Sequence, residues 1–238
     1  MRDIVDDLSF AITQVMESFP DVKSLESPFP EVKKDDLIIT NKMYQCPSLR
    51  KMHVEIANLK GLKILHSIFY PDPHYNLPIF GCDIVATDKA ITAAIVDVSP
   101  VHGVDDRFYS QIREISNNFT FSERRPLPLW ADEIFSPYCK FMRINKSIEI
   151  ANFYCIVMNY LNVFSNDIHH TLKDDVWVDT MKRYDDQVYY CNQQKKNDKT
   201  RGILEKLFDK EWAEEYINTV LFDLPCLKEH HTCKDYLT

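Results

Sequence analysis

The pattern of apolar and polar positions divides the chain into a helical start, a strand-rich middle and a helical end. After a proline-bearing connector, short segments rich in β-branched and aromatic residues alternate with turn signals, which predicts strands. These predicted strands cover residues 37–46, 50–58, 63–70, 79–86, 90–98 and 137–144. The opening segment instead repeats at helical spacing and predicts an amphipathic helix. Its apolar positions are Ile4, Leu8, Ile12, Val15 and Met16.

Helical patterns return after the first predicted strands. Asp105 can cap a short helix, and the long apolar stretch that follows Ser147 is typical of a helix pressed against a sheet. Two further helices are predicted at about 176–196 and 209–221, the second capped by Asp209. Because a meander of strands is flanked in sequence by helices, we predict one antiparallel sheet covered by helices on both faces. The predicted buried face of the last helix holds Trp212, Tyr216, Ile217, Val220 and Leu221.

Composition narrows the classes of function. A chain of 238 residues with 45% hydrophobic and 12% aromatic residues can bury a sizeable core. Its net charge of −8 argues against general binding of nucleic acid, which requires a surplus of Lys and Arg. The four glycines form no dinucleotide-binding or P-loop motif, so a nucleotide or flavin would need another device.

Cysteine spacing and the length of apolar runs indicate the cellular compartment of the protein. The seven cysteines are scattered and form no C-x-x-C pair, so we predict neither a disulfide framework nor a zinc site. The first residues carry acids within their apolar face and do not resemble a signal peptide. No run approaches the ~20 apolar residues of a membrane span. We therefore expect a cytoplasmic protein that binds neither membrane nor nucleic acid.

The stretch "MHVEIANLKGLKILHSIF", residues 52–69, places polar groups inside an apolar hairpin. If Lys60 and Gly61 form a two-residue turn, Glu55 lies opposite His66. The same register puts His53 on the face that holds this pair, because side chains alternate along a strand. The opposite face is apolar enough to serve the core alone, so the polar face requires another explanation.

The next predicted strand, "LPIFGCDIVA", carries Asp83 at an interior position where aspartate is disfavoured unless its charge is satisfied. Together with His53, Glu55 and His66 it forms a cluster of titratable groups. Residue types alone leave several interpretations open. The cluster can be a solvated cross-strand ion pair, a two-histidine, one-carboxylate metal site, a proton donor to a substrate that receives electrons from elsewhere, or a noncatalytic pocket.

Several long segments resemble, in order, the ferredoxin-dependent bilin reductases. They are "NKMYQCPSLRKMHVEIANLKGLKILHSIFYPDPHYNLPIFGCDIVA", "AAIVDVSP", "LPLWADEIFSPYC" and "QQKKNDKTRGILEKLFDKEWAEEYINTVLFD", within about residues 37–224. The resemblance implies an α/β fold, a single-domain three-layer α/β/α sandwich, with biliverdin IXα bound between the sheet and the C-terminal helices. It implies a monomer with no bound metal, flavin or nicotinamide, which takes electrons from reduced 2Fe-2S ferredoxin. The tail after Leu224 is unmatched.

The resemblance also implies roles for individual residues. Asp83 matches the carboxylate that protonates the bilin, and His66 matches the histidine that binds the lactam oxygen and shares protons with that carboxylate. Glu55 matches the glutamate that acts at the D-ring vinyl group, with His53 as its neighbour. Asn197 matches a pocket asparagine. Arg125 and Lys199 match anchors for the propionates, and the remaining substrate-binding positions are Ile64, Trp130 and Ile203.

The retained Glu55, His66 and Asp83 favour a four-electron route to phycocyanobilin, with the D-ring vinyl reduced first and the A-ring second, through bilin radicals. The alternatives are a two-electron bilin reductase with a different product and a noncatalytic bilin carrier. For the electron donor, a local basic cluster offsets the acidic net charge and can steer an acidic ferredoxin. It consists of Lys195, Lys196, Lys199, Arg201 and Lys206.

Overall fold

The computed structural model describes residues 3–227, and within that range nine strands form a single sheet. Every pairing is antiparallel, in the order β1-β3-β4-β5-β6-β7-β9-β8, and β2 lies beside β1 along the outer edge of β3. The strands are β1 Lys23–Ser24, β2 Glu31–Lys34, β3 Leu37–Cys46, β4 Leu49–Leu59, β5 Leu62–Pro71, β6 Ile79–Thr87, β7 Ile91–Ser99, β8 Glu123–Arg124 and β9 Lys140–Ile144.

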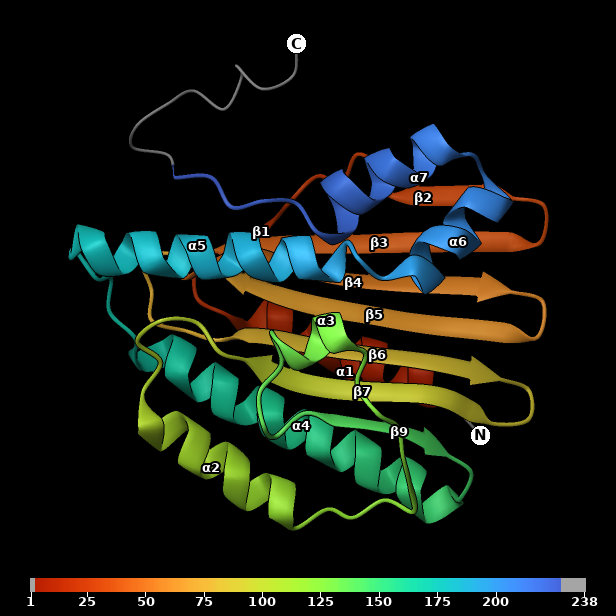
Figure 1. Cartoon of the computed structure of the whole chain (residues 1–238), viewed down its shortest axis with the longest axis horizontal. Helices are drawn as coiled ribbons and strands as arrows, with labels where there is room; N and C mark the ends of the chain where they lie inside the picture. Colours follow the sequence, from red (N-terminus) through yellow and green to blue (C-terminus); the bar gives the residue numbers. More distant parts are fainter. Residues whose placement is uncertain (1–2, 228–238) are drawn as a thin grey trace.

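Helices cover both faces of this sheet. Helices α1, α2 and α4 share one hydrophobic core with one face, whereas α3, α5, α6 and α7 lie over the other face, which is turned toward the viewer in Figure 1. The helices are α1 Ile4–Ser18, α2 Asp106–Asn117, α3 Leu129–Asp132, α4 Ser147–His170, α5 Trp177–Gln194, α6 Asp198–Leu207 and α7 Lys210–Tyr216, the last followed by the π-helical turn η1 Ile217–Leu221. The predicted three-layer sandwich is therefore confirmed.

The alternation of side chains along β4 and β5 explains the two layers. Met52, Val54, Leu65 and Phe69 point into the core beneath α1 and α4 and are almost fully buried. The residues between them point to the other face, under α5 to α7. The sheet thus presents an apolar floor to one helical layer and a partly polar floor to the other.

The β4–β5 hairpin has the predicted register. Glu55 pairs with His66 and His53 pairs with Ile68. Gly61 at the tip has a φ of +74°, a conformation that glycine adopts without steric cost. The polar residues of the hairpin are therefore placed on one face by the turn itself.

The predicted helix starts are also confirmed. The side chain of Asp105 accepts the backbone N–H of Arg107 at 2.7 Å at the start of α2. Asp209 accepts the N–H of Trp212 at 2.8 Å at the start of α7. Each of these caps satisfies a backbone N–H that has no partner within the helix.

Several features of the structure were not predicted from the sequence pattern. Helix α6 was not predicted, because Leu204 is its only buried residue and no apolar stripe marks it. Strand β9 begins later than expected, since Ser136 binds the buried Asp97 and holds the preceding residues in a loop. The cysteine spacing predicted no disulfide framework and so gave no sign of the disulfide bond that Cys226 forms.

No helix within residues 3–227 has the length and apolar character needed to cross a membrane. The unmatched tail after Leu224 falls mostly outside the described residues.

Candidate functional site

One row of side chains crosses the sheet on the face beneath α5 to α7. The register pairs Asn41 with Glu55, Glu55 with His66, and His66 with Asp83. It continues through Ile95 on β7 to Phe141 on β9. Paired residues of neighbouring strands point to the same face. The sheet therefore places all four polar side chains of the row on one surface.

Arg125 extends the row at the β9 end. Its backbone N–H bonds to the carbonyl of Phe141 at 2.9 Å, and its guanidinium carbon lies 4.8 Å from the centre of the Phe141 ring. One guanidinium nitrogen donates to the carbonyl of Thr92 at 2.8 Å. Because a guanidinium carries five N–H donors, Arg125 retains donors for an anionic group above the sheet.

His66 and Asp83 form the centre of the site. The Nδ1 of His66 and Oδ1 of Asp83 are hydrogen-bonded at 2.5 Å. Burial alone would lower the pKa of His66, but the charge and hydrogen bond of Asp83 outweigh burial and raise it. The Asp83 side chain is 43% exposed, whereas the Nε2 atom of His66 is buried without a partner. The pair thus offers an open carboxylate beside an unused imidazole nitrogen.

Glu55 is buried one strand away from this pair, with 8% of its surface exposed. Its Oε2 accepts the hydroxyl proton of Tyr216 at 2.6 Å. Burial raises the pKa of Glu55, against the lowering effects of His66 and of the Tyr216 hydrogen bond. A carboxyl group with a raised pKa can hold a proton closer to neutral pH and donate it.

His53 is fully buried and differs from His66 in its protonation. Burial, with the positive charges of Lys51 and His66, holds its pKa well below the usual value. Its Nε2 lies 2.8 Å from Oδ1 of Asn41, while its Nδ1 has no partner. Burial therefore favours the neutral form of the His53 imidazole.

The remaining predicted site residues surround this row at different depths. Ile64 lies on β5 on the same face as His66, and Trp130 of α3 packs edge-on to Phe135 with 6.3 Å between ring centres. Asn197 instead caps α6: its Oδ1 accepts the N–H of Lys199 at 3.2 Å and its Nδ2 donates to Thr200 at 3.2 Å. The structure therefore does not bond Asn197 to the His66–Asp83 pair.

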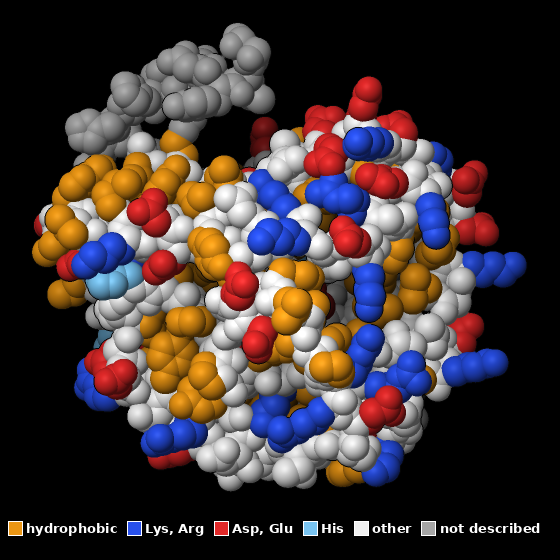
Figure 2. Space-filling model, in the orientation of Figure 1, with side chains coloured by type: hydrophobic (Ala, Val, Ile, Leu, Met, Phe, Trp, Pro, Cys, Tyr) orange, Lys and Arg blue, Asp and Glu red, His pale blue; other side chains and the backbone are white. Residues whose placement is uncertain are grey.

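Two other predicted residues of α6 are open to solvent. Lys199 is exposed and Ile203 is 46% exposed. The face built from α3, α5 and α6 is hollowed between these helices, and Lys and Arg side chains stand around the hollow (Figure 2). Lys199 and Ile203 thus belong to the covering layer, above the row rather than within it.

Asn41, Tyr216 and Phe222 are site residues that the sequence did not single out. Asn41 could have been found by extending the hairpin register by one strand, since it pairs with Glu55. Tyr216 was predicted only as a buried helix residue, and Phe222 packs edge-on against His66 with 6.0 Å between ring centres. The contacts of Tyr216 and Phe222 with the row span more than 150 residues of sequence, so no local pattern indicates these two residues.

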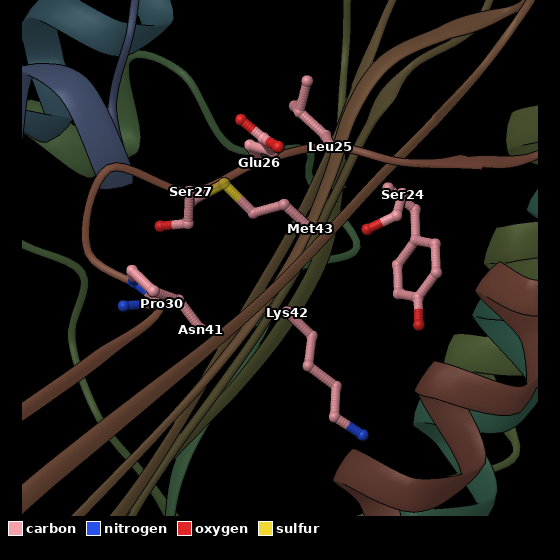
Figure 3. A pocket seen from close by; sticks show the side chains of 9 residues that line it. Ser24, Leu25, Glu26, Ser27, Pro30, Asn41, Lys42 and Met43 are labelled. Carbon is pink, nitrogen blue, oxygen red and sulfur yellow. The ribbon is translucent and has the colours of Figure 1, made fainter.

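A cavity of about 460 Å³ opens at the outer edge of β3, next to Asn41 (Figure 3). None of His66, Asp83 and Glu55 lines it. It is bounded by Ser24, Leu25, Glu26, Ser27, Pro30, Asn41, Lys42, Met43 and Tyr44. This cavity adjoins the end of the row and is distinct from the surface above the His66–Asp83 pair.

The metal interpretation receives no support from the geometry. Among residues 3–227, no three His, Cys, Asp or Glu side chains are arranged to hold a metal ion. The Nε2 of His53 is turned to Asn41, and Glu55 is bonded to Tyr216.

Comparison with known proteins identifies relatives that match most of the chain. The sequence model of a family described as ferredoxin-dependent bilin reductase matches residues 10–223. The chain is 45% identical over 193 residues to phycocyanobilin:ferredoxin oxidoreductase of Synechococcus sp. (strain CC9605), covering 80% of this chain and 78% of the relative. It is 41% identical over 234 residues to the protein of the same name from Synechococcus sp. (strain CC9902), covering 94% of each chain.

A solved structure shares the fold. The crystal structure of phytochromobilin synthase from tomato in complex with biliverdin superposes with a TM-score of 0.77. The two sequences are 16% identical, and the match covers 92% of this chain and 83% of the other. At this identity the likeness concerns the fold.

Proposed function

Because this chain belongs to the ferredoxin-dependent bilin reductases, we propose that it reduces biliverdin IXα to phycocyanobilin with electrons from reduced ferredoxin. The observation that carries the proposal is the row of Glu55, His66 and Asp83 on the face of the sheet beneath α5 to α7. The relatives that match most of the chain are named for this reaction.

The proposed reaction adds four electrons and four protons to the bilin. Ferredoxin supplies the electrons singly, so each vinyl reduction passes through a bilin radical. An added electron makes the conjugated tetrapyrrole more basic, and an acid placed beside it can complete a proton-coupled reduction. The D-ring vinyl group is reduced first and the A-ring second.

Asp83 and His66 are proposed to act together. Their 2.5 Å contact allows the pair to hold and share one proton. The unpartnered Nε2 of His66 suits a hydrogen bond to the lactam oxygen. The exposure of Asp83 supports this role, because an exposed carboxylate can contact a bilin and regain its proton from solvent between steps.

Glu55 is proposed to protonate the D-ring vinyl group, next to His53. Burial favours the protonated form of Glu55, as this role requires.

The other predicted residues are proposed to bind the substrate. Arg125 suits a propionate because its free N–H donors can bind a carboxylate in a bidentate manner. Lys199 supplies a second charge from α6, and Asn197 approaches the bilin from the same helix. Ile64, Trp130 and Ile203 are proposed to contact the rings.

Ferredoxin is proposed to dock over the basic cluster defined above, at the junction of α5 and α6. Lys196, Lys199 and Lys206 are exposed there. Arg201 contributes less charge, because it pairs with Glu214.

A monomer in the cytoplasm, with no metal, flavin or nicotinamide bound, remains our prediction.

One experiment separates this proposal from its alternatives. The protein is incubated without oxygen with biliverdin and a ferredoxin-reducing system, and the pigments are resolved by chromatography. We expect phycocyanobilin. A stable two-electron product would indicate a different bilin reductase, and bound but unchanged biliverdin would indicate a carrier. Activity that requires iron and oxygen would favour the metal site.

A further inference from the structure

A directed chain of hydrogen bonds ends at Glu55. Asn41 donates from Nδ2 to the backbone carbonyl of Phe29 at 2.7 Å, and a carbonyl can only accept. This contact fixes the orientation of the amide, so its Oδ1 faces Nε2 of His53, which must donate. The other hydrogen of Nδ2 reaches the hydroxyl of Tyr216 at 2.9 Å. The Tyr216 hydroxyl lies 3.2 Å from Oδ1 of Asn41 but only 2.6 Å from Oε2 of Glu55, so its single proton is directed to Glu55.

The phenol of Tyr216 is held firmly in this position. Its side chain is 1% exposed, and its ring stacks on Trp212 with 4.8 Å between centres and an interplanar angle of 14°. Phe29 packs against it at 60°. The hydroxyl therefore reaches Glu55 without the entropy cost of ordering a mobile side chain.

The segment that follows Tyr216 is bonded to two residues of β4. Lys51 donates to the carbonyl of Val220 at 2.8 Å and pairs with Asp223. Arg50 binds the same carboxylate at 2.7 Å. The π-helical turn η1 lies between Tyr216 and Asp223, and such turns recur at functional sites.

We propose that Tyr216 is a positioning residue for the D-ring reduction: its hydroxyl orients the Glu55 carboxyl toward the bilin and couples its proton occupancy to the Asn41–His53 pair. This inference rests on the proposed function of Glu55. It assigns to the C-terminal helix a part in the D-ring step and none in the A-ring step, because Tyr216 contacts neither His66 nor Asp83 by a hydrogen bond.

The test removes only the hydroxyl. Tyr216→Phe keeps the aromatic packing and is compared with Tyr70→Phe, which removes a buried hydroxyl on the same face. Tyr70 bonds to the carbonyl of Leu221 at 3.3 Å and does not bond to Glu55. Thermal unfolding and biliverdin binding of both variants establish that each is folded.

Two readouts are measured. In the bilin-free protein, infrared titration follows the band of the protonated Glu55 carboxyl, assigned by its loss in Glu55→Gln. Since the Tyr216 hydrogen bond opposes the effect of burial on the pKa of Glu55, Tyr216→Phe should move the midpoint upward by about one pH unit.

In turnover, D-ring reduction should slow about tenfold while A-ring reduction is preserved, so a two-electron bilin with an intact D-ring vinyl accumulates.

The outcomes are distinguishable. An unchanged infrared midpoint and product ratio in Tyr216→Phe would overturn the inference, as would equal changes in Tyr70→Phe. If the unmodified protein does not reduce biliverdin at all, the proposed function fails, whereas the infrared shift still reports on the hydrogen bond.

Discussion

At the scale of single residues, the site consists of neighbouring groups whose protonation differs because their surroundings differ. His53 and Glu55 lie two positions apart on β4, yet burial favours the neutral form of each. His66 on the next strand gains a carboxylate partner, and its pKa is raised instead. One face of a hairpin thus holds a neutral imidazole, a carboxyl group inclined to keep its proton and an imidazole inclined to gain one.

These differences in protonation predict that Glu55 and Asp83 serve different steps of the reduction. Glu55→Gln keeps size and hydrogen bonding but removes the acid, so the A-ring should still be reduced and the D-ring vinyl should remain. Asp83→Asn should bind biliverdin, accept one electron and stall as a long-lived radical. Electron paramagnetic resonance and product chromatography measure both results. Normal phycocyanobilin formation by Glu55→Gln, or free turnover by Asp83→Asn, would show that these roles are wrong.

Asp97 gives a prediction about stability. It is 2% exposed, accepts three hydrogen bonds from Ser99 and Ser136, and burial raises its pKa from 3.8 to about 6. The folded protein therefore binds this proton more tightly than the unfolded chain, so stability falls as the pH rises from about 4 to about 6.

Asp97→Asn removes this titration. Across that pH interval the wild type should lose up to about 3 kcal/mol of unfolding free energy relative to the variant. Denaturant unfolding of both proteins at several pH values measures the difference. A difference independent of pH would contradict the assignment.

At the scale of elements, the C-terminal segment from α7 to Asp223 holds the covering layer on the sheet. Lys51 is almost fully buried, and its charge is compensated by Asp223 and the Val220 carbonyl. Removing one member of a buried ion pair leaves the other charge unpaired, which costs more than the pair contributes.

Asp223→Asn should therefore destabilise the fold by about 2 kcal/mol, less than for a fully buried pair because Asp223 is 32% exposed. In this variant, hydrogen exchange should accelerate at the amides of residues 217–222 more than at the amides of β4 and β5. The exposed Asp36→Asn serves as the control, with a change within about 0.5 kcal/mol. Equal stability of the two variants would mean that the Lys51–Asp223 pair does not stabilise the packing of this C-terminal segment on the sheet.

The elements also show what the sequence can and cannot predict. The long strands and the β4–β5 register followed from alternation and a glycine turn, and these alone united His53, Glu55 and His66 on one face. Helix α6 and the two-residue strands carry too little periodicity to be recognised. The bonds of Asn41 and Tyr216 depend on how the C-terminal helix packs on the sheet, which local spacing does not encode.

At the scale of the whole molecule, the proposed function brings an acidic ferredoxin to a protein that is itself acidic. The net charge of −8 opposes this encounter, so the local basic cluster at the junction of α5 and α6 has to direct it. Interactions between exposed charges are screened beyond a Debye length of about 8–10 Å.

Lys196→Glu should raise the apparent KM for ferredoxin several-fold at low salt and leave biliverdin affinity nearly unchanged. Lys195→Glu should act in the same direction, although Lys195 is only partly exposed. Lys146→Glu, on the exposed start of α4 in the opposite layer, is the matched control. Steady-state kinetics at several salt concentrations measures the effect, and identical salt profiles for Lys196→Glu and Lys146→Glu would place the docking surface elsewhere.

The most direct test of the account is the number of electrons that the protein passes to one bilin. Reduced ferredoxin is titrated without oxygen into the stoichiometric biliverdin complex, and the pigments are identified after each addition. We predict that four ferredoxins are oxidised per biliverdin, that the D-ring vinyl is already reduced at the midpoint, and that phycocyanobilin is the final pigment. Oxidation that ends after two ferredoxins, or a bilin that remains unreduced, would contradict the account.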